Sequence, residues 1–213
     1  MARFVITGTG TDIGKTVFAA GLTGLLRASY WKPIQTGVAP PDSPCDPYIP
    51  APGSDAALVS RMTGAPIIPE TVILPDPLSP HRAAELAGVT IPDLPLPAAD
   101  PLIIEGAGGL LVPITRDLLS ADLFARWSLP VILVATTGLG TISHTLTAIE
   151  SLRARGCRLH GVAFVGDDNP DNIATIAQMG GVRALGRLPR LDPLTPDTLA
   201  HAMRAAFDPG DFL

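Results

Sequence analysis

A glycine-rich loop between an apolar strand and an apolar helix constrains this chain more than any other part of its sequence. The loop reads GTGTDIGKT at residues 8–16, after the apolar run Phe4–Ile6 and before the helical run Val17–Leu26. In this order backbone N–H groups converge on an anion, and the N-terminus of the helix adds its positive end. Lys15 would neutralise the β- and γ-phosphates of ATP, and the Thr16 hydroxyl would bind the Mg²⁺ that bridges them. The residues expected to contact the nucleotide here are Asp12, Ile13, Gly14, Lys15, Thr16 and Val17.

Two details of the loop bear on this interpretation. The standard phosphate-loop motif has its first glycine where Thr9 stands, whereas this chain has Gly8 and Gly10 on either side. One alternative is a tight strand-to-helix turn with an ordinary surface lysine, and another is a dinucleotide-binding fingerprint. That fingerprint needs Gly-x-Gly-x-x-Gly, but Gly14 comes one residue too late and is followed by Lys-Thr. We therefore favour a phosphate loop over a dinucleotide site.

The rest of the chain alternates short apolar runs with helical patterns. Short, nearly continuous apolar runs predict buried parallel strands, and they lie at Phe4–Ile6, Ala28–Trp31, Leu102–Ile104, Val131–Ala135 and Gly161–Val165. The predicted helices are Gly14–Arg27, Asp55–Met62, Ser120–Trp127, Ser143–Arg155 and Ile173–Met179. Such alternation implies β-α crossovers with helices on both sheet faces. We therefore expect an α/β fold, a P-loop NTPase-type three-layer domain with a mainly parallel central sheet.

Composition fits one domain. The 213 residues are 46% hydrophobic and 16% charged, which provides enough apolar surface for a core without disulfides or metal. The segments Ala39–Pro52 and Ile91–Pro101 are rich in proline, which fixes φ and removes a backbone donor, so they predict surface loops. Cys45 and Cys157 have neither metal-ligand nor redox spacing, and we assign them no role. A single domain is expected over residues 1–213.

Charge and hydropathy argue against several classes of partner. The net charge is -5, and the sequence has no basic stripe for a nucleic-acid backbone. The first ten residues hold too few apolar side chains for a signal peptide, and no apolar run approaches the roughly 20 residues of a membrane span. The sequence therefore predicts a cytoplasmic protein that binds neither nucleic acid nor membrane.

Three further charged residues, Lys32, Asp55 and Glu105, lie at the ends of predicted strands or at the start of a predicted helix. Lys32 comes after Ala28–Trp31, and ligands of an open parallel sheet gather at the carboxyl ends of its strands. A solvated strand-end lysine is the alternative. Asp55 opens a helix after Ser54; either side chain could cap that helix, and Asp55 could instead bind Mg²⁺. Glu105 ends an apolar strand, where a buried carboxylate is costly unless it is paired or metal-bound.

The same segments resemble the dethiobiotin synthetase family. The resemblance rests on Gly-Thr-x-Thr-x-x-Gly-Lys-Thr at 8–16, Lys-Pro-x-x-Thr-Gly at 32–37, Ser-Asp at 54–55, Ser-Pro-His at 79–81, Glu-Gly-Ala-Gly-Gly at 105–109, Pro-Val-Ile-Leu-Val at 130–134 and Leu-Gly-x-Ile-x-His at 139–144. These segments keep the family's order over about two-thirds of the chain. The phosphate loop is generic, whereas the lysine and glutamate segments are specific to the family.

The resemblance implies an ATP-dependent ligase reaction. An amine of diaminopelargonate takes up carbon dioxide as a carbamate, the carbamate attacks the γ-phosphate of ATP, and the second amine closes the ring as phosphate leaves. This chemistry needs mainly positioning and anion stabilisation, which Lys15, Lys32 and Mg²⁺ would supply. By the same resemblance the catalytic residues are Lys32 and Lys15, the metal ligands Thr16, Asp55 and Glu105, the substrate contacts Thr11 and Thr36, and further nucleotide contacts Asp55, Glu105, Gly106, Ala107, Gly108, Leu188, Pro189 and Arg190.

The resemblance also implies a homodimer. In the family the start of one helix receives the carboxylate of the substrate bound to the partner subunit, and a helix N-terminus suits an anion; the residues here are Gly140, Thr141, Ile142 and Ser143. His81 and His144 are expected to be packed or capping side chains. The segment Phe164–Asn169 lacks the Asn-Asp pair that often reads adenine in the family. Backbone groups near residues 188–190 could hold the base, so the nucleotide preference stays open, with ATP as the default.

Two other classes of P-loop protein are alternatives to the ligase. Related amide ligases of the cobyric acid synthase type usually carry a glutamine-hydrolysing module, for which this chain has no room. A P-loop ATPase switch of the cell-division-site type tends to have a second lysine inside the phosphate loop and an amphipathic membrane-binding tail. Here the loop carries Asp12, and the tail Asp208–Leu213 is short and acidic. The sequence therefore favours the ligase and keeps the switch as the alternative.

Overall fold

The computed structural model describes residues 2–39 and 50–212 of the chain. Cys45 and residues 40–49 of the first proline-rich segment lie outside the described residues. The second segment, Ile91–Pro101, has no helix or strand, as predicted. It still packs on the core, because Leu94 is buried and its carbonyl accepts a hydrogen bond of 2.9 Å from Trp127 Nε1.

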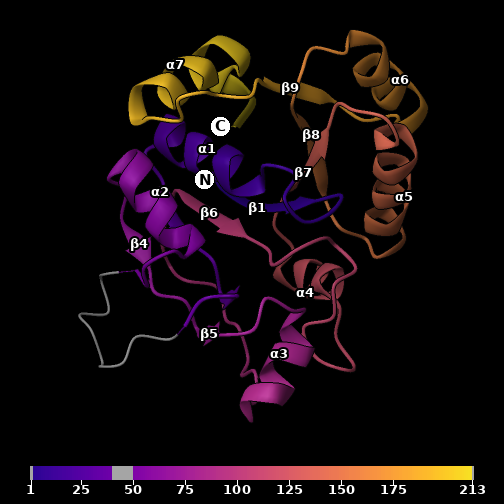
Figure 1. Cartoon of the computed structure of the whole chain (residues 1–213). Coiled ribbons are helices and arrows are strands. Elements are labelled where there is room, and N and C mark those ends of the chain that lie inside the picture. Colours follow the sequence, from indigo (N-terminus) through magenta and orange to yellow (C-terminus); the bar gives the residue numbers. More distant parts are fainter. Residues whose placement is uncertain (1, 40–49, 213) are drawn as a thin grey trace.

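A seven-stranded sheet forms the centre of the molecule (Figure 1). The spatial order is β4-β2-β6-β1-β7-β8-β9, and all its pairings are parallel. A separate pair, β3 and β5, is also parallel. The bounds are β1 Arg3–Gly8, β2 Ser29–Trp31, β3 Ile34–Thr36, β4 Ile67–Ile68, β5 Val72–Leu74, β6 Leu102–Glu105, β7 Val131–Thr136, β8 Leu159–Val165 and β9 Ala184–Leu188. The five strands predicted from sequence are confirmed, except that Ala28 precedes β2.

Helices cover both faces of this sheet, so the predicted three-layer α/β fold is confirmed. Figure 1 shows α1, α2 and α7 on one face and α4, α5 and α6 on the other, with α3 beside β3 and β5. The bounds are α1 Lys15–Leu26, α2 Asp55–Thr63, α3 Pro80–Ala87, α4 Ser120–Trp127, α5 Thr141–Ala154, α6 Pro170–Gly180 and α7 Pro196–Ala206, followed by a 3-10 turn at Pro209–Phe212. The predicted helices are confirmed, although α5 and α6 begin two and three residues earlier than expected.

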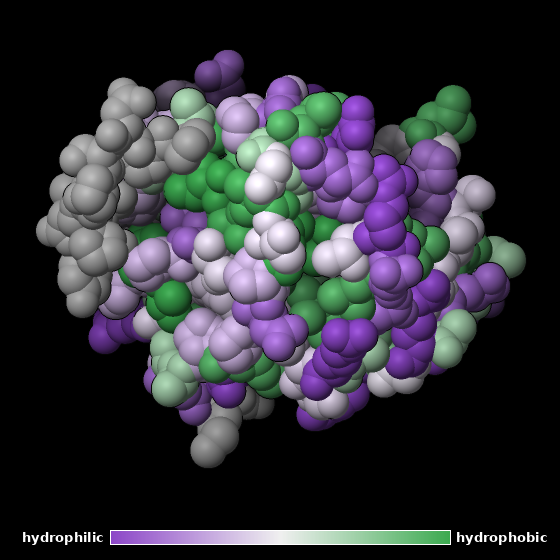
Figure 2. All heavy atoms as spheres, turned by 90° about the horizontal axis from the view of Figure 1, so that it is seen from below, coloured by the Kyte–Doolittle hydropathy of each residue, from purple (hydrophilic) through white to green (hydrophobic). Residues whose placement is uncertain are grey.

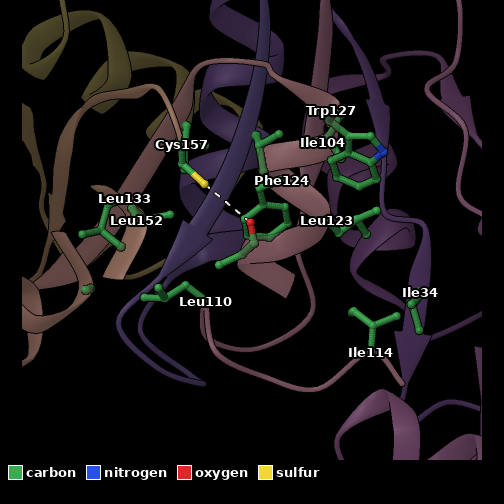
Figure 3. Close-up of a cluster of buried hydrophobic side chains, with 14 of the residues drawn as sticks. Ile34, Ile104, Leu110, Ile114, Leu123, Phe124, Trp127, Leu133, Leu152 and Cys157 are labelled. Carbon is green, nitrogen blue, oxygen red and sulfur yellow. Dashed lines mark hydrogen bonds between the residues drawn. The ribbon is translucent and has the colours of Figure 1, made fainter. Parts of the chain in front are cut away.

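Strand alternation divides the core into two halves. In β1, Val5 faces the half that packs against α4, α5 and α6, whereas Phe4 and Ile6 face α1, α2 and α7. Successive side chains of a strand point to opposite faces, and strands buried on both faces read as continuous apolar runs. Figure 3 shows the first half around Phe124, where the Cys157 thiol donates to the Ala121 carbonyl at 3.5 Å. Cys157 is therefore a packed core residue.

Candidate active site

Sheet register brings the phosphate loop, Glu105 and Lys32 to the same edge. Glu105 is the last residue of β6 and pairs with Ile6 of β1, two residues before the phosphate loop begins. On its other side β6 pairs with β2, where Trp31 is opposite Ile104. The next residue, Lys32, therefore leaves β2 beside Glu105. The predicted gathering of strand-end residues is observed, as expected for a parallel sheet.

These residues open into a cleft of about 920 Å³, which we call the phosphate cleft. The site residues predicted from sequence that line it are Thr11, Asp12, Ile13, Gly14, Lys15, Thr16, Val17, Lys32, Thr36, Asp55, Glu105, Ala107 and Gly108. Gly106 lies behind them: it is buried, its N–H donates to the Ile6 carbonyl at 2.9 Å, and a Cβ there would lie 2.8 Å from Phe124. Gly106 therefore serves packing at the floor of the cleft.

Glu105 is the centre of a buried hydrogen-bond network. Its side chain is 1% exposed. Thr16 Oγ1 donates to Glu105 Oε1 at 2.8 Å, and Tyr30 Oη donates to Oε2 at 2.8 Å. The Lys32 ammonium lies 3.7 Å from Oε1 and also forms an ion pair with Asp55. This carboxylate is thus paired, as a buried charge requires.

Burial and opposite charges act against each other in this network. Burial raises the pKa of Glu105, and the nearby Lys32 ammonium partly offsets that rise. For Lys32, burial favours the neutral amine, but the carboxylates of Glu105 and Asp55 outweigh it and raise the pKa. Burial lowers the pKa of Lys15. With Lys32 charged, Lys32, Asp55 and Glu105 carry one surplus negative charge, which suits a further cation.

The phosphate loop is held by its glycines and by one lysine contact. Gly14 caps α1 with φ of 91°, and a Cβ there would lie 2.7 Å from Val165. A side chain at Gly8 would meet Ile13 and Lys15. Lys15 Nζ donates to the Gly10 carbonyl at 2.6 Å. The loop therefore tolerates Thr9 where the standard motif has its first glycine. Side chains would clash at Gly8 and Gly14, and both of these positions are glycine.

Of the two interpretations of residues 54 and 55, the structure confirms the cap, and the Mg²⁺ role of Asp55 stays a prediction. Ser54 is the N-cap of α2, and its hydroxyl accepts from the Ala57 N–H at 3.1 Å. Asp55 is the first helical residue and turns its carboxylate to Lys32. Its own N–H donates at 3.1 Å to Gln35 Oε1, a buried side chain that sequence reasoning missed. The signal for Gln35 was its position inside the segment 32–37, and Tyr30 was missed because its partner is 75 residues away.

A second cavity of about 400 Å³ lies at the ends of β7 and β8, and we call it the β8 cavity. Its lining residues are Thr136, Thr137, Gly138, Val165, Gly166, Asp167, Asp168, Asn169 and Arg190. Leu188 is buried at the end of β9, and Pro189 lines a separate surface hollow. Asn169 and Asn172 both donate to the Thr137 carbonyl, at 3.1 and 2.9 Å. Of the three residues predicted near the base, Arg190 therefore reaches this cavity.

The start of α5 lies apart from the phosphate cleft of its own chain. Gly140 is the N-cap, with φ of 88°. Because glycine has no side chain, the first turn of α5 has no side-chain cap. Leu139, directly before it, is fully exposed. His144 is exposed on α5 and does not cap it, so its expected packing is wrong. His81 is half-buried, with Nδ1 3.0 Å from Ser79 Oγ at the start of α3, in keeping with a local structural role.

Several known proteins are similar to this chain in sequence. A family model described as an AAA domain matches residues 2–198. The ATP-dependent dethiobiotin synthetase BioD of Novosphingobium aromaticivorans is 51% identical, with 100% of each chain covered. That of Rhodopseudomonas palustris strain BisB18 is 50% identical over 99% of this chain and 98% of its own.

Among solved structures, the MinC:MinD cell division protein complex of Aquifex aeolicus matches with a TM-score of 0.52. Its identity is 14%, over 95% of this chain and 86% of that one, so the likeness shows the fold alone. Among the described residues, no helix has the length and apolar character needed to cross a membrane.

Proposed function

The chain belongs to the ATP-dependent dethiobiotin synthetase family, and from that membership we propose that its phosphate cleft binds ATP, Mg²⁺ and diaminopelargonate. It is an ATP-dependent ligase of biotin biosynthesis that forms carbon–nitrogen bonds. The observation that carries the proposal is the meeting of the phosphate loop, Lys32 and Glu105 in one cleft. Lys32 and Glu105 are charged side chains buried beside the loop, where charges are costly unless they are paired or bind a ligand.

The reaction divides into steps that place different demands on the cleft. One substrate amine adds to carbon dioxide and loses a proton to give a carbamate, whose oxygen attacks the γ-phosphorus as ADP leaves. The second amine then attacks the carbamoyl carbon, closes the ring and releases phosphate. Each step forms or moves negative charge, so the protein's task is to hold anions together and exclude water.

Lys32 and Lys15 are the cations that meet this demand. Both carboxylate neighbours keep Lys32 protonated, so it presents a permanent positive charge where the carbamate and γ-phosphate meet. Lys15 contacts its own loop at the Gly10 carbonyl, and phosphates bound by the loop would take over its ammonium. Thr11 and Thr36 line the same cleft, and in this proposal their hydroxyls would donate to the substrate or its carbamate.

The oxygen donors of the cleft fit a magnesium ion. Mg²⁺ takes one or two carboxylates, with water and phosphate oxygens completing an octahedron. Neighbouring ligands of that octahedron lie about 2.9 Å apart when each is about 2.0–2.1 Å from the ion. Thr16 Oγ1 and Glu105 Oε1 are 2.8 Å apart, and Asp55 adds a second carboxylate across Lys32. When bound, the ion would neutralise phosphate charge.

The substrate site is completed by a second subunit in this proposal. At the start of α5, Gly140 and Ser143 are exposed, Thr141 is buried and no side chain caps the first turn, so the N–H groups of this turn suit the substrate carboxylate of a partner. Figure 2 shows several groups of apolar side chains among polar ones on one face, and exposed apolar side chains favour association. Exposed apolar residues include Leu78, Leu86, Val89 and Leu111. We place the homodimer in the cytoplasm, where ATP is available.

The primary test is phosphate release from purified protein with MgATP and bicarbonate, with and without diaminopelargonate. We expect release that depends on the diamine, with dethiobiotin as the product, and parallel runs with CTP and GTP rank the nucleotides. Release that is indifferent to the diamine would contradict the proposal and favour the ATPase switch. Arg116→Ala, at an exposed side chain that pairs with Glu85 and does not line the cleft, serves as the control and should keep full activity.

Complementation tests the shared site. Lys32→Ala removes the cation of one site, and Ser143→Asp places a negative charge where the partner's substrate carboxylate is expected. Each variant alone is expected to be inactive. Mixed subunits restore one intact site in each heterodimer, so about one quarter of wild-type activity should return with random pairing. No recovery, with heterodimers present by native mass spectrometry, would show that the α5 start does not serve the site of the partner subunit.

A further inference from the structure

The two oxygens of the Glu105 carboxylate face different partners. Oε1 is directed to the cleft, where it accepts from Thr16 at 2.8 Å and lies 3.7 Å from the Lys32 ammonium. Oε2 is directed into the protein, where it accepts from the Tyr30 hydroxyl at 2.8 Å. The two sides of the carboxylate are thus held by different elements, α1 in front and β2 behind.

Tyr30 reaches Glu105 from a fixed position. The side chain is 0% exposed, and β2 pairs with β6 so that Tyr30 lies opposite Ile103. Two residues later, Lys32 leaves the same strand on the same side, because side chains alternate along a strand. One short strand therefore delivers both a neutral donor and a cation to Glu105. Because Tyr30 is fully buried, its hydroxyl is shielded from bulk solvent.

We propose that Tyr30 is a positioning residue, whose hydroxyl fixes the Glu105 carboxylate so that Oε1 stays directed at the Thr16 side of the cleft. A carboxylate held at one oxygen can rotate, whereas one held at both oxygens has a single orientation. Partners behind a metal ligand orient it and tune its affinity. This inference rests on the proposed function, since it takes Glu105 as the acid that faces Mg²⁺.

Tyr30→Phe tests this role with the removal of one oxygen atom. The readout is the dissociation constant of ADP measured by calorimetry, once with Mg²⁺ and once with a chelator. We expect metal-free affinity to be unchanged and the gain that Mg²⁺ provides to shrink by about 10-fold or more. Thr23→Val is the matched control, because Thr23 Oγ1 is a buried hydroxyl on α1 without a partner among the described residues. It should leave both constants unchanged.

Three outcomes would overturn the inference. A full Mg²⁺-dependent gain in Tyr30→Phe would show that Glu105 needs no support from behind. An equal loss of affinity with and without Mg²⁺ would show a general role in the fold. In a Glu105→Gln background Tyr30→Phe should cause no further loss, and a further loss of the same size would show that Tyr30 acts through another group.

The same measurements separate this inference from the proposed metal site. If Glu105→Gln itself keeps the whole Mg²⁺-dependent gain, the assignment of Glu105 as a metal-facing acid fails. If Glu105→Gln loses the gain and Tyr30→Phe does not, the metal assignment stands and only the positioning role of Tyr30 fails.

Discussion

Two charge clusters in this protein have a similar make-up and opposite surroundings. At the phosphate cleft, Lys32 lies between Asp55 and Glu105, with side chains that are 8%, 31% and 1% exposed. On the surface, Glu85 lies between Arg82 and Arg116, at 3.1 and 2.6 Å, with exposures of 37%, 51% and 66%. Water screens the second cluster, so its pairs contribute little to stability.

The buried cluster is different because its charges have left water. Taking charges out of water is costly, and in our proposal the ligands of the cleft offset that cost. The surface cluster satisfies its charges in place and needs no ligand. The comparison teaches that burial, more than the number of ion pairs, marks the functional site. Substitutions in the two clusters should therefore differ in their effects on activity and stability.

The largest effect is expected from Lys32→Ala. Removing a cation that stabilises developing negative charge costs about 10²–10³-fold in turnover, and we expect the upper end because Lys32 faces both reacting anions. ADP affinity should fall far less, since the loop and Lys15 remain. Steady-state kinetics and calorimetry check both. Arg116→Ala, the matched removal of a cation from the surface cluster, should keep the wild-type turnover number, and full activity in Lys32→Ala would remove its catalytic role.

Stability should also separate the clusters. Lys32→Met leaves Glu105 and Asp55 without their cation, and breaking a buried ion pair typically costs about 3–5 kcal/mol. Since Asp55 is partly exposed, we expect a loss near the lower end in the free energy of unfolding, measured with urea. Glu105→Gln in the same variant should recover part of it. Unchanged stability in Lys32→Met would mean that the cluster is solvated after all.

Gly14 of the phosphate loop can be compared with Gly64, which ends α2. Gly14 and Gly64 both have positive φ, at 91° and 64°, but only at Gly14 would a Cβ meet another residue, Val165. Gly64→Ala should therefore cost about 1 kcal/mol from backbone strain alone, and Gly14→Ala about 1–3 kcal/mol with weaker ADP binding. Thermal unfolding and calorimetry measure the two effects. Equal losses would show that the contact with Val165 is absorbed.

The smallest effect is expected at the surface cluster, in the form of a pH dependence. Hydrogen bonds from Arg116 and Arg82 lower the pKa of Glu85 from 4.5 to about 2. Its contribution is therefore present above pH 4.5 and is lost as the pH falls toward 2. Glu85→Gln should lower the melting temperature by less than about 2 °C at pH 7. A difference from wild type that grows on acidification would contradict this sign.

The sequence reveals those parts of the site that are contiguous or end a strand. The phosphate loop is one unbroken segment, and Lys32 and Glu105 follow apolar runs, so strand-end geometry places them. Tyr30 and Gln35 could not be assigned, because their roles depend on partners from distant segments. The carboxyl Oε2 of Glu105, for example, is satisfied by a phenol that looks like an ordinary strand residue.

The fold shows the same division. Apolar runs predicted β1, β2, β6, β7 and β8, but β3, β4 and β5 have two or three residues each and were not predicted. Two helices carried a usable signal that was overlooked: α3 and α7 each begin with a hydroxyl residue followed by proline, Ser79-Pro80 and Thr195-Pro196. Proline favours the first helical position. The proposed role of α5 in a second subunit's site depends on a contact between chains, which the fold of one chain does not determine.

The most direct test of the account follows labelled carbon from bicarbonate in a single turnover, with MgATP and diaminopelargonate in wild type and in Lys32→Ala. Mass spectrometry should find dethiobiotin carrying one labelled carbon for each ADP formed by the wild type, no labelled product without the diamine, and labelled product that forms about 10²–10³-fold more slowly in Lys32→Ala. ATP hydrolysis that proceeds equally with and without the diamine, and leaves the label in bicarbonate, would contradict the account.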